Sequence, residues 1–516
     1  MAPRRTLVAL VSSLTIVAAG ALASPAAAHG RGTPEEKFAQ KVTTRNVLGH
    51  LGALQKIADQ NGGNRAALTP GYEASARYVE RTLKKAGYRT ERDPFTFEDL
   101  VVDTDTLTEN SPGTAEYEVA QMQFSPNSPV GGVTGDLVTP AGTFGCTPDT
   151  WSGIDVVGKI ALISRGSCNF SFKALYAYQA GAAGVVVYNN VPDAQLSNVT
   201  LGTEGLVPIP VGGIRQADGQ ALAAALPTGP VNVTLDLTSH LEEFESFNVI
   251  AETRQGRDDN VVMLGAHLDG VEAGPGINDN GTGSATILEV AVQLAKSHTR
   301  HHNTVRFAWW GAEERGLLGS TAYVAELKDQ PGELERIATY LNYDMVGSPN
   351  YVIGVYDADQ STYPAPPNVP IPEGSAATED VLTSWFDATG QPWVDTQFSG
   401  RSDYQAFILN GIPASGLFTG ADGSKTAAEV ALFGGTVGIP YDPNYHQAGD
   451  TLSNVNRDAL GIMTKAIAAS TYSLAWDTEA INGVSGPGDG HTWPGHGHGP
   501  GRHGDLEDRV TLERAS

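Results

Sequence analysis

Three runs of apolar residues in the second half of the chain predict buried β-strands. They cover residues 261–266, 304–310 and 338–343, and each is soon followed by a histidine or an acidic residue. Continuous apolar runs are typical of strands in parallel sheets, which helices cover on both faces. A further run over residues 285–295 has little polar interruption and predicts a helix packed on this sheet. Active sites of open α/β sheets lie where such strands end.

The predicted fold is therefore α/β, with a mixed, mostly parallel sheet and helices on both faces. A chain of 516 residues exceeds one ordinary core, so we expect two folded units plus tails. Residues 46–99 and 246–481 are predicted to form the main unit and residues 100–245 an insert. Residues 29–45 are expected to be a mobile start or a pro-segment. Residues 482–516 begin with a Gly/Pro/His-rich stretch and are expected to be a disordered tail.

The insert has its own β-rich pattern. We expect helices at 170–180 and 216–226, and no group of metal ligands or nucleophiles stands out among its residues. A lid or a docking module is therefore a better interpretation than a second active site. The predicted strands of the insert are 158–165, 184–189, 206–211 and 231–237.

Five short motifs at or near the strand ends of the main unit carry histidines and carboxylates. Imidazoles and carboxylates form a mixed N/O ligand set that suits zinc. One carboxylate between two cations can bridge them, so the pattern favours a two-metal centre, and no His-Glu-x-x-His helix offers a one-zinc site instead. The motifs are G-A-H-L-D with His267 and Asp269, N-D-N-G with Asp279, W-G-A-E-E with Glu313 and Glu314, N-Y-D-M with Asp344, and N-Y-H with Tyr445 and His446.

Each candidate also has a structural alternative. A single aspartate at a strand end is usually a cap, and Asp269 could be a turn residue. Tyr445 could belong to the core, and Arg401 could form a surface ion pair with Asp403. For Asp269 the functional interpretation is that its carboxylate orients His267, because a ligating histidine usually gives its other N–H to such a group.

Longer versions of these motifs resemble the cocatalytic-zinc aminopeptidases, and most closely the secreted actinobacterial leucyl-aminopeptidase type. The stretches I-N-D-N-G-T-G-S, F-A-W-W-G-A-E-E, Y-L-N-Y-D-M-V-G-S-P-N, G-R-S-D-Y and L-F-T-G follow one another in the family's order. The resemblance covers residues 47–99 and 247–476 and implies the zinc-dependent exopeptidase fold. The insert resembles a protease-associated domain, a small module found within several secreted peptidases.

The resemblance implies a role for each site residue. One zinc would be held by His267 and Asp344 and the other by Glu314 and His446, with Asp279 as the bridge and a cis peptide bond after it. Glu313 would be the general base, Tyr445 a hydrogen-bond donor to the developing oxyanion, and Asp269 the partner of His267. Arg401, Met345 and Phe418 would border the substrate.

The two cysteines, Cys146 and Cys168, both lie in the insert, and an exported chain is expected to pair them. Family members often carry a cysteine pair beside the Tyr-His loop, but Asn444 and Gly449 stand in that neighbourhood here. This departure leaves the rigidity of the loop open.

Residues 1–28 are typical of a secretion signal. Arg4 and Arg5 precede an alanine-rich apolar stretch, and Ala26 to Ala28 form a small-residue cleavage site. The protein is therefore expected to be extracellular, with no membrane span. The formal net charge of -25 disfavours nucleic acid as a partner and leaves room for a calcium ion, although the chain has no EF-hand loop.

The predicted function is the release of single amino acids, preferably large apolar ones, from free peptide N-termini by a monomeric enzyme with two zinc ions. Three alternatives share the fold. A carboxypeptidase would require the other terminus to be free. A glutaminyl-cyclase-type acyl transferase would retain one zinc, and an inactive binding ectodomain would have lost ligands.

Overall fold

The computed structural model describes residues 32–192, 195–197, 199–297, 300–367 and 369–486. The predicted signal segment and most of the predicted tail lie outside these residues. Among the described residues, no helix is both long and apolar enough to cross a membrane.

The main unit is built on a mixed sheet in the strand order β1-β7-β9-β8-β10-β13-β11-β12. The central strands β9, β8, β10 and β13 run parallel, and antiparallel neighbours flank them. This arrangement confirms the predicted fold class. The strands are β1 (Thr90–Ser111), β7 (Asn232–Glu252), β8 (Arg257–His267), β9 (Asn303–Trp310), β10 (Ile337–Tyr343), β11 (Gly354–Tyr356), β12 (Val394–Thr396) and β13 (Ala414–Phe418).

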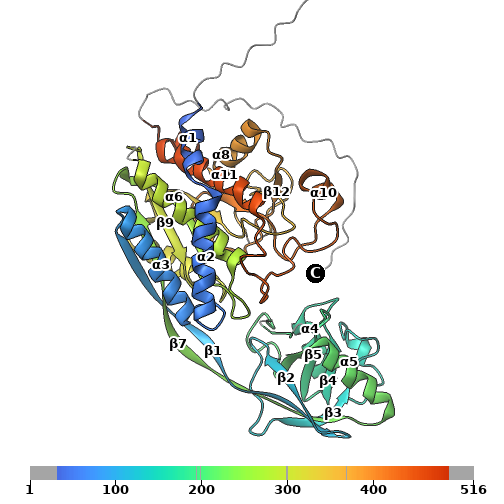
Figure 1. Cartoon of the computed structure of the whole chain (residues 1–516). Coiled ribbons are helices and arrows are strands. Elements are labelled where there is room, and N and C mark those ends of the chain that lie inside the picture. The colour runs from blue at the N-terminus through green and yellow to red at the C-terminus, as the bar shows by residue number, and fades with distance from the viewer. Residues whose placement is uncertain (1–31, 193–194, 198, 298–299, 368, 487–516) are drawn as a thin grey trace, which may run out of the picture.

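Strand side chains alternate between two apolar layers, as the pleat of a β-strand requires. Leu264 and Trp309 belong to the layer shared with α1, α2, α3, α6, α8 and α11, whereas Met263 and Trp310 belong to the layer shared with α7 and α9. Helices therefore cover both faces of the sheet (Figure 1). The helices of this unit are α1 (Pro34–Lys41), α2 (Thr44–Gln60), α3 (Pro70–Ala86), α6 (Gly283–Ser297), α7 (Leu318–Asp329), α8 (Ser375–Thr389), α9 (Tyr404–Leu409), α10 (Ala427–Phe433), α11 (Arg457–Trp476) and α12 (Glu479–Asn482).

Two very long strands carry the insert. β1 and β7 pair antiparallel from Thr90 opposite Ala251 to Ser111 opposite Asn232, so the predicted boundaries near residues 100 and 245 fall inside one continuous ribbon. The insert lies at the far end of this ribbon, away from the helices of the main unit (Figure 1). It contains β2 (Ala115–Gln121), β3 (Val133–Val138), β4 (Ile160–Ser164), β5 (Gly184–Tyr188), β6 (Val211–Ile214), α4 (Phe170–Gln179) and α5 (Gln216–Ala225).

Most elements predicted for the insert are present, and Cys146 and Cys168 form the predicted disulfide. The strand predicted at 206–211 is wrong, because β6 begins only at Val211. Val207 and Ile209 are nevertheless buried in the apolar cluster of the insert, so their hydrophobicity reflects packing of an irregular segment and not a strand.

The expectation of a mobile start is wrong for residues 34–45. Thr33 and Glu36 form a reciprocal capping box at the beginning of α1. Phe38 is 2% exposed and stacks on Tyr472 of α11, with ring centroids 5.4 Å apart. Helix α1 is therefore part of the core.

Replacing Phe38 by alanine should destabilise the main unit by about 3 kcal/mol, because a buried aromatic ring would leave a cavity against α11. Urea unfolding measures this loss. Gln40→Ala, on the exposed side of the same helix, is the matched control and should change the free energy of unfolding little. Equal stabilities of the two variants would show that α1 does not belong to the folded core.

Candidate metal centre

Two histidines anchor two adjoining groups of carboxylates. Nε2 of His267, at the end of β8, lies 3.2 Å from Oδ1 of Asp279 and 3.3 Å from Oδ1 of Asp344. Nε2 of His446 lies 3.2 Å from Oδ2 of Asp279 and 2.9 Å from Oε2 of Glu314. The two oxygens of Asp279 thus face different imidazoles, and the structure brings the five predicted ligands together in two groups that share this carboxylate.

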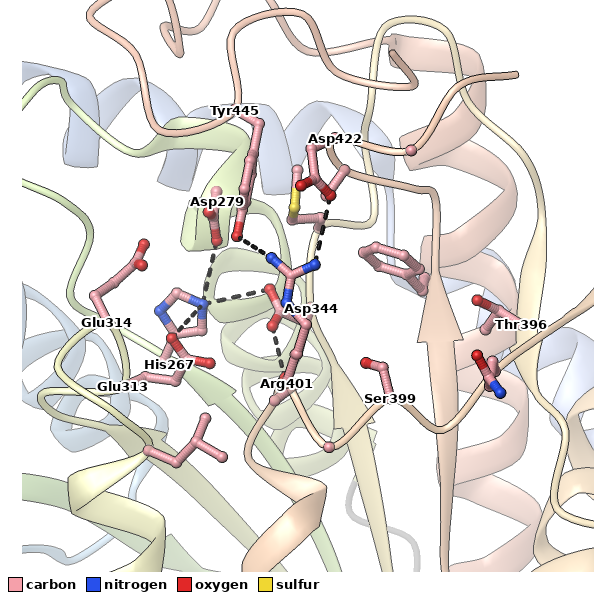
Figure 2. A pocket seen from close by; sticks show the side chains of 18 of the residues that line it. His267, Asp279, Glu313, Glu314, Asp344, Thr396, Ser399, Arg401, Asp422 and Tyr445 are labelled. Carbon is pink, nitrogen blue, oxygen red and sulfur yellow. Dashed lines mark hydrogen bonds and ion pairs between the residues drawn. The ribbon is translucent and has the colours of Figure 1, made fainter. Parts of the chain in front are cut away.

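The sheet and its connections bring these side chains together. His267 ends β8, Glu313 and Glu314 lie in the turn after β9, and Asp344 follows β10, so three neighbouring strands deliver them to one edge of the sheet (Figure 2). Asp279 lies in a short π-type turn, Ile277–Thr282, just before α6, and the peptide bond between Asp279 and Asn280 is cis, as the family resemblance implies.

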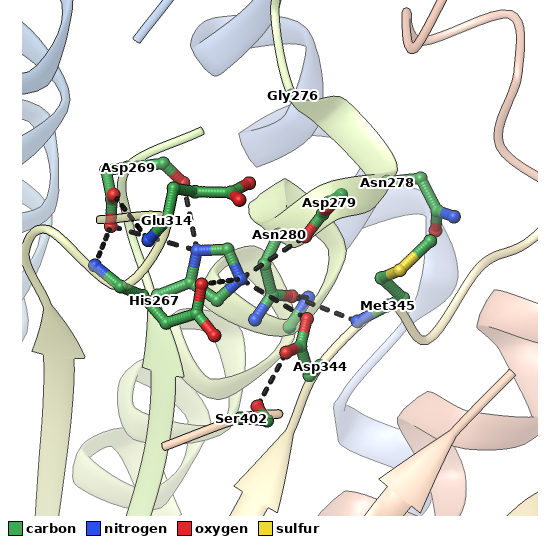
Figure 3. Close-up of polar contacts among 12 residues, drawn as sticks. His267, Asp269, Gly276, Asn278, Asp279, Asn280, Glu314, Asp344, Met345 and Ser402 are labelled. Carbon is green, nitrogen blue, oxygen red and sulfur yellow. Dashed lines mark hydrogen bonds and ion pairs between the residues drawn. The ribbon is translucent and has the colours of Figure 1, made fainter. Parts of the chain in front are cut away.

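The partner of His267 is the predicted residue, Asp269, but the contact is made by its backbone carbonyl oxygen and not by its carboxylate. Its Nδ1 lies 3.1 Å from the backbone carbonyl oxygen of Asp269 and 3.8 Å from the carboxylate of that residue. Since a carbonyl can only accept, Nδ1 carries the proton and Nε2 faces the two carboxylates. The Asp269 carboxylate instead accepts the backbone N–H group of Glu313 at 3.2 Å and that of Glu314 at 3.3 Å. Figure 3 shows Asp269 beside Glu314.

Burial and mutual repulsion govern the titration of the cluster. Burial raises the pKa of Glu313 well above its ordinary value, and raises that of Glu314 to about 7. Burial opposes a charge on His446, yet its hydrogen bonds to Asp279 and Glu314 raise its pKa to about 10. The protein thus presents a buried excess of negative charge that draws protons onto its imidazoles, and a metal cation can take their place.

Two orphaned oxygen atoms test whether the residues fit a metal. Within the described chain, Oε1 of Glu314 and Oδ1 of Asp344 are buried and accept no hydrogen bond, although Oδ1 of Asp344 faces Nε2 of His267 at 3.3 Å. They belong to different ligand groups, and within each group the ligand atoms lie within 4.8 Å of one another. Buried oxygens of this kind need a donor or a cation, so the side chains present fit one metal ion in each group.

The predicted oxyanion donor and the predicted arginine meet across the site. The hydroxyl of Tyr445 lies 3.4 Å from Nη2 of Arg401, and Nη1 of Arg401 lies 3.5 Å from Asp422 (Figure 2). Burial, together with the charges of Asp279 and Glu314, raises the pKa of the Tyr445 phenol well above its ordinary value. The phenol therefore keeps its proton at neutral pH and can donate a hydrogen bond.

A cavity of about 600 Å³ opens beside the two groups. Carboxylates line one part of it and apolar side chains another, and Met345 and Phe418 are among the apolar ones, as the resemblance implies. Tyr356 also lines the cavity and stacks on Phe418, with ring centroids 6.3 Å apart. The cavity therefore offers an acidic end and an apolar wall.

Sequence reasoning did not identify Ser402 as a partner of Asp344. The Ser402 hydroxyl donates to Oδ2 of Asp344 at 2.6 Å and accepts from Nδ2 of Asn342 at 2.8 Å. This contact fixes which oxygen of Asp344 remains for a metal. In the sequence, Ser402 stands within the motif G-R-S-D-Y, but only Arg401 of this motif was predicted to have a functional role.

Asp450 was also not identified as a site residue. Its two carboxylate oxygens accept the backbone N–H groups of Asn278 and Asp279, at 2.7 and 2.9 Å. Asp450 thus fixes the turn that presents Asp279. Asp450 lies 171 residues after Asp279 and binds its backbone, so no motif or fixed spacing in the sequence could indicate this contact.

A further carboxylate group, Asp357, Glu379 and Asp395, lies outside this centre. Asp357 accepts the backbone N–H groups of residues 361–363, and Glu379 accepts those of Ala358 and Asp359. These bonds already explain the two buried carboxylates as the support of a loop. The calcium ion considered from the sequence stays a prediction.

The fold and the two ligand groups define a class, the metal-dependent hydrolases built on a mixed α/β sheet. The model of peptidase family M28 matches residues 248–471, and the PA domain model matches residues 133–222. The chain is 42% identical over 447 residues to the probable lipoprotein aminopeptidase LpqL of Mycobacterium tuberculosis, covering 86% of this chain and 87% of that protein. It is 40% identical over 450 residues to leucine aminopeptidase 2 of Trichophyton tonsurans, covering 87% of each.

Among solved structures, BSAP, a zinc aminopeptidase from Bacillus subtilis, matches with a TM-score of 0.66 at 25% identity, over 84% of this chain and 95% of that one. The chain belongs to peptidase family M28 and carries an inserted PA domain. The predicted enzyme class, a zinc-dependent aminopeptidase, is confirmed.

Ser402→Ala should lower the stability of the metal-free protein by about 1–3 kcal/mol, because the buried Asp344 would lose its donor. Chemical unfolding in the presence of a chelator measures the change. Ser399→Ala, at the exposed rim of the same loop, is the control and should have a small effect. If both variants unfold alike, the contact does not support Asp344.

Proposed function

We propose that this protein is a secreted aminopeptidase that uses two zinc ions to remove large apolar residues from peptide N-termini. The observation that carries the proposal is the placement of the two oxygens of Asp279 between two imidazoles, each with its own second carboxylate. A shared carboxylate between two ligand sets is the arrangement expected of a two-metal hydrolase.

The proposed ligands are His267 and Asp344 in one group, Glu314 and His446 in the other, and Asp279 in both. When bound, two zinc ions would supply Lewis acidity to the scissile carbonyl and to the attacking water. The residues that hold and move protons belong to the chain itself.

Glu313 is the proposed general base. It is 8% exposed, lines the cavity, and its Oε2 lies 3.8 Å from Nε2 of His267. Its raised pKa suits a carboxylate that accepts a proton from water and then delivers it to the leaving amine. Tyr445, with its phenol protonated, would donate to the oxygen that gains negative charge in the tetrahedral transition state.

The shape and charge of the cavity support an exopeptidase with an apolar preference. A free α-ammonium group is favoured by the carboxylates of Asp279, Glu313 and Asp344, which line one part of the cavity. The wall formed with Met345 and Phe418 favours an apolar first side chain, since each buried methylene contributes about 0.8 kcal/mol.

The three rival functions have less support. An acyl transferase of the glutaminyl-cyclase type would need only one metal, whereas five ligand side chains converge here. An inactive binding ectodomain gives no reason to retain them. A carboxypeptidase would favour a free carboxylate, which the acidic cavity would repel.

Secretion rests on the sequence of residues 1–28, which lie outside the described part of the chain. The resemblance to the secreted actinobacterial type supports it, and the name of the LpqL relative describes a lipoprotein. Oligomeric state, with a monomer expected, stays a prediction.

Glu313→Gln should lower kcat by about 100-fold or more while both zinc ions remain bound, because the base is lost and no ligand is. Glu314→Gln is the matched comparison, since this neighbouring residue is a proposed ligand and its variant should lose zinc. Metal analysis and kcat are measured on the same samples. Loss of zinc from Glu313→Gln would show that Glu313 is a ligand. Full activity of this variant would show that Glu313 is not the general base.

The substrate prediction compares leucyl, glycyl, glutamyl and N-acetyl-leucyl p-nitroanilides. The leucyl substrate should give the highest kcat/KM because its side chain fills the apolar wall, and the glutamyl substrate should rank low because carboxylates repel it. The acetylated substrate should resist hydrolysis, since it lacks the ammonium charge. Equal hydrolysis of the acetylated and free leucyl substrates would exclude an aminopeptidase.

A further inference from the structure

A fully buried arginine, Arg65, packs against the backbone that joins His267 to the turn of Asp279. Arg65 is in the connection between α2 and α3, about 200 residues before His267, the first of the predicted ligands, and its side chain is 0% exposed. Burial lowers its pKa to about 10, so the guanidinium remains charged at neutral pH. None of its side-chain hydrogen bonds within the described chain goes to a carboxylate.

All three hydrogen bonds of the guanidinium end on one segment of backbone. Nε donates to the carbonyl of Pro275 at 2.8 Å, and the two Nη atoms donate to the carbonyls of Leu268 and Gly276. Residues 268–276 join His267 to the turn that contains Asp279. Arg65 therefore holds both ends of the segment that joins His267 to the turn of Asp279.

The backbone of this segment is shaped around the guanidinium. Gly276 has a φ of +61°, and a Cβ atom there would lie 3.2 Å from Nη2 of Arg65 and 2.6 Å from the carbonyl oxygen of Asp279. A side chain at residue 276 would thus be strained in conformation and would crowd both partners. The close approach of arginine and backbone requires glycine.

Asp450 holds the next residues by their N–H groups. Its backbone carbonyl accepts from Ile277 at 3.1 Å, and its carboxylate accepts from Asn278 and Asp279. The guanidinium thus binds the carbonyls of Pro275 and Gly276, and the Asp450 carboxylate binds the N–H groups of Asn278 and Asp279 that follow. The two side chains also attract each other, and Asp450 is the largest electrostatic influence that favours the charged form of Arg65.

We infer that Arg65 is a positioning residue for the metal centre, which sets the spacing between His267 and Asp279 and balances part of the buried negative charge. This inference rests on the proposed ligands. It assigns a part of the metal site to the N-terminal region of the chain, before the insert.

The test uses the full-length enzyme with Arg65→Met, which removes charge and hydrogen bonds, and Arg65→Lys, which keeps the charge but loses the planar fork. Zinc affinity is measured by competition with a chromophoric chelator, and kcat and KM are measured with leucyl p-nitroanilide at saturating zinc. The melting temperature is recorded with and without zinc.

Both variants should bind zinc about 10- to 100-fold more weakly, as expected when a group that supports a metal ligand is lost. At saturating zinc kcat should fall more than KM changes, and the zinc-dependent rise in melting temperature should shrink. If Arg65→Met does not fold, Arg65→Lys decides the outcome.

Arg306→Met is the matched control. Arg306 is a second buried arginine, 8% exposed, and its partners are Glu252 and Tyr323, away from the proposed ligands. This variant should lose stability with unchanged zinc affinity. The inference is overturned if the Arg65 variants behave as Arg306→Met does. Failure of the wild-type enzyme to bind two zinc ions would overturn the proposed function itself.

Discussion

The concentration of negative charge at one edge of the sheet is the constraint on which the rest of the structure depends. Asp269, Asp279, Glu313, Asp344 and Asp450 are each at most 8% exposed. Carboxylates in such surroundings are costly unless donors or cations accompany them. The chain provides backbone N–H groups for Asp269 and Asp450, hydroxyls, imidazoles and one buried guanidinium. Among the described residues, Oε1 of Glu314 and Oδ1 of Asp344 still accept no hydrogen bond. Bound metal ions would therefore offset the buried negative charge of the core in addition to supplying the chemistry.

The predictable part of the site is the part that follows directly from strand patterns. Buried strands end in short motifs, and parallel strands bring their carboxyl ends to the same edge, so His267, Glu313 and Asp344 could be grouped from the sequence alone. Ser402, Asp450 and Arg65 could not, because their contacts depend on the path of distant loops and, for the last two, are made to backbone atoms. The same reason explains Asp269, where the residue was identified but the bonding atoms were not.

The fold follows a similar division. The apolar runs located β9, β10 and the end of β8 within one residue, although β8 begins at Arg257, four residues before its run, and no run indicated β13. β1 and β7 continue between the two units because they pair with each other there, through a stretch of β7, residues 240–245, that is largely exposed and that no apolar run marks. A domain boundary inferred from where a family pattern stops cannot detect such continuity. Helix α1 was missed for the opposite reason, since its two buried residues, Phe38 and Ala39, are too few to give a periodic signal.

Adjacent residues in this site make different contacts, and the conformation of the backbone explains how. Within the described chain, eight non-glycine residues have positive φ, and Ala312, Leu317, Met345 and His446 among them lie in the site or next to it. A left-handed residue turns the chain sharply, so successive side chains need not alternate as in a strand. Glu313 therefore lies closest to His267 and Glu314 to His446. Asp344 faces His267 while Met345 borders the cavity, and Tyr445 approaches Arg401 while His446 faces Asp279. At Asp344 and Met345, a sharp turn of the backbone thus lets one side chain face a histidine while its neighbour borders the cavity.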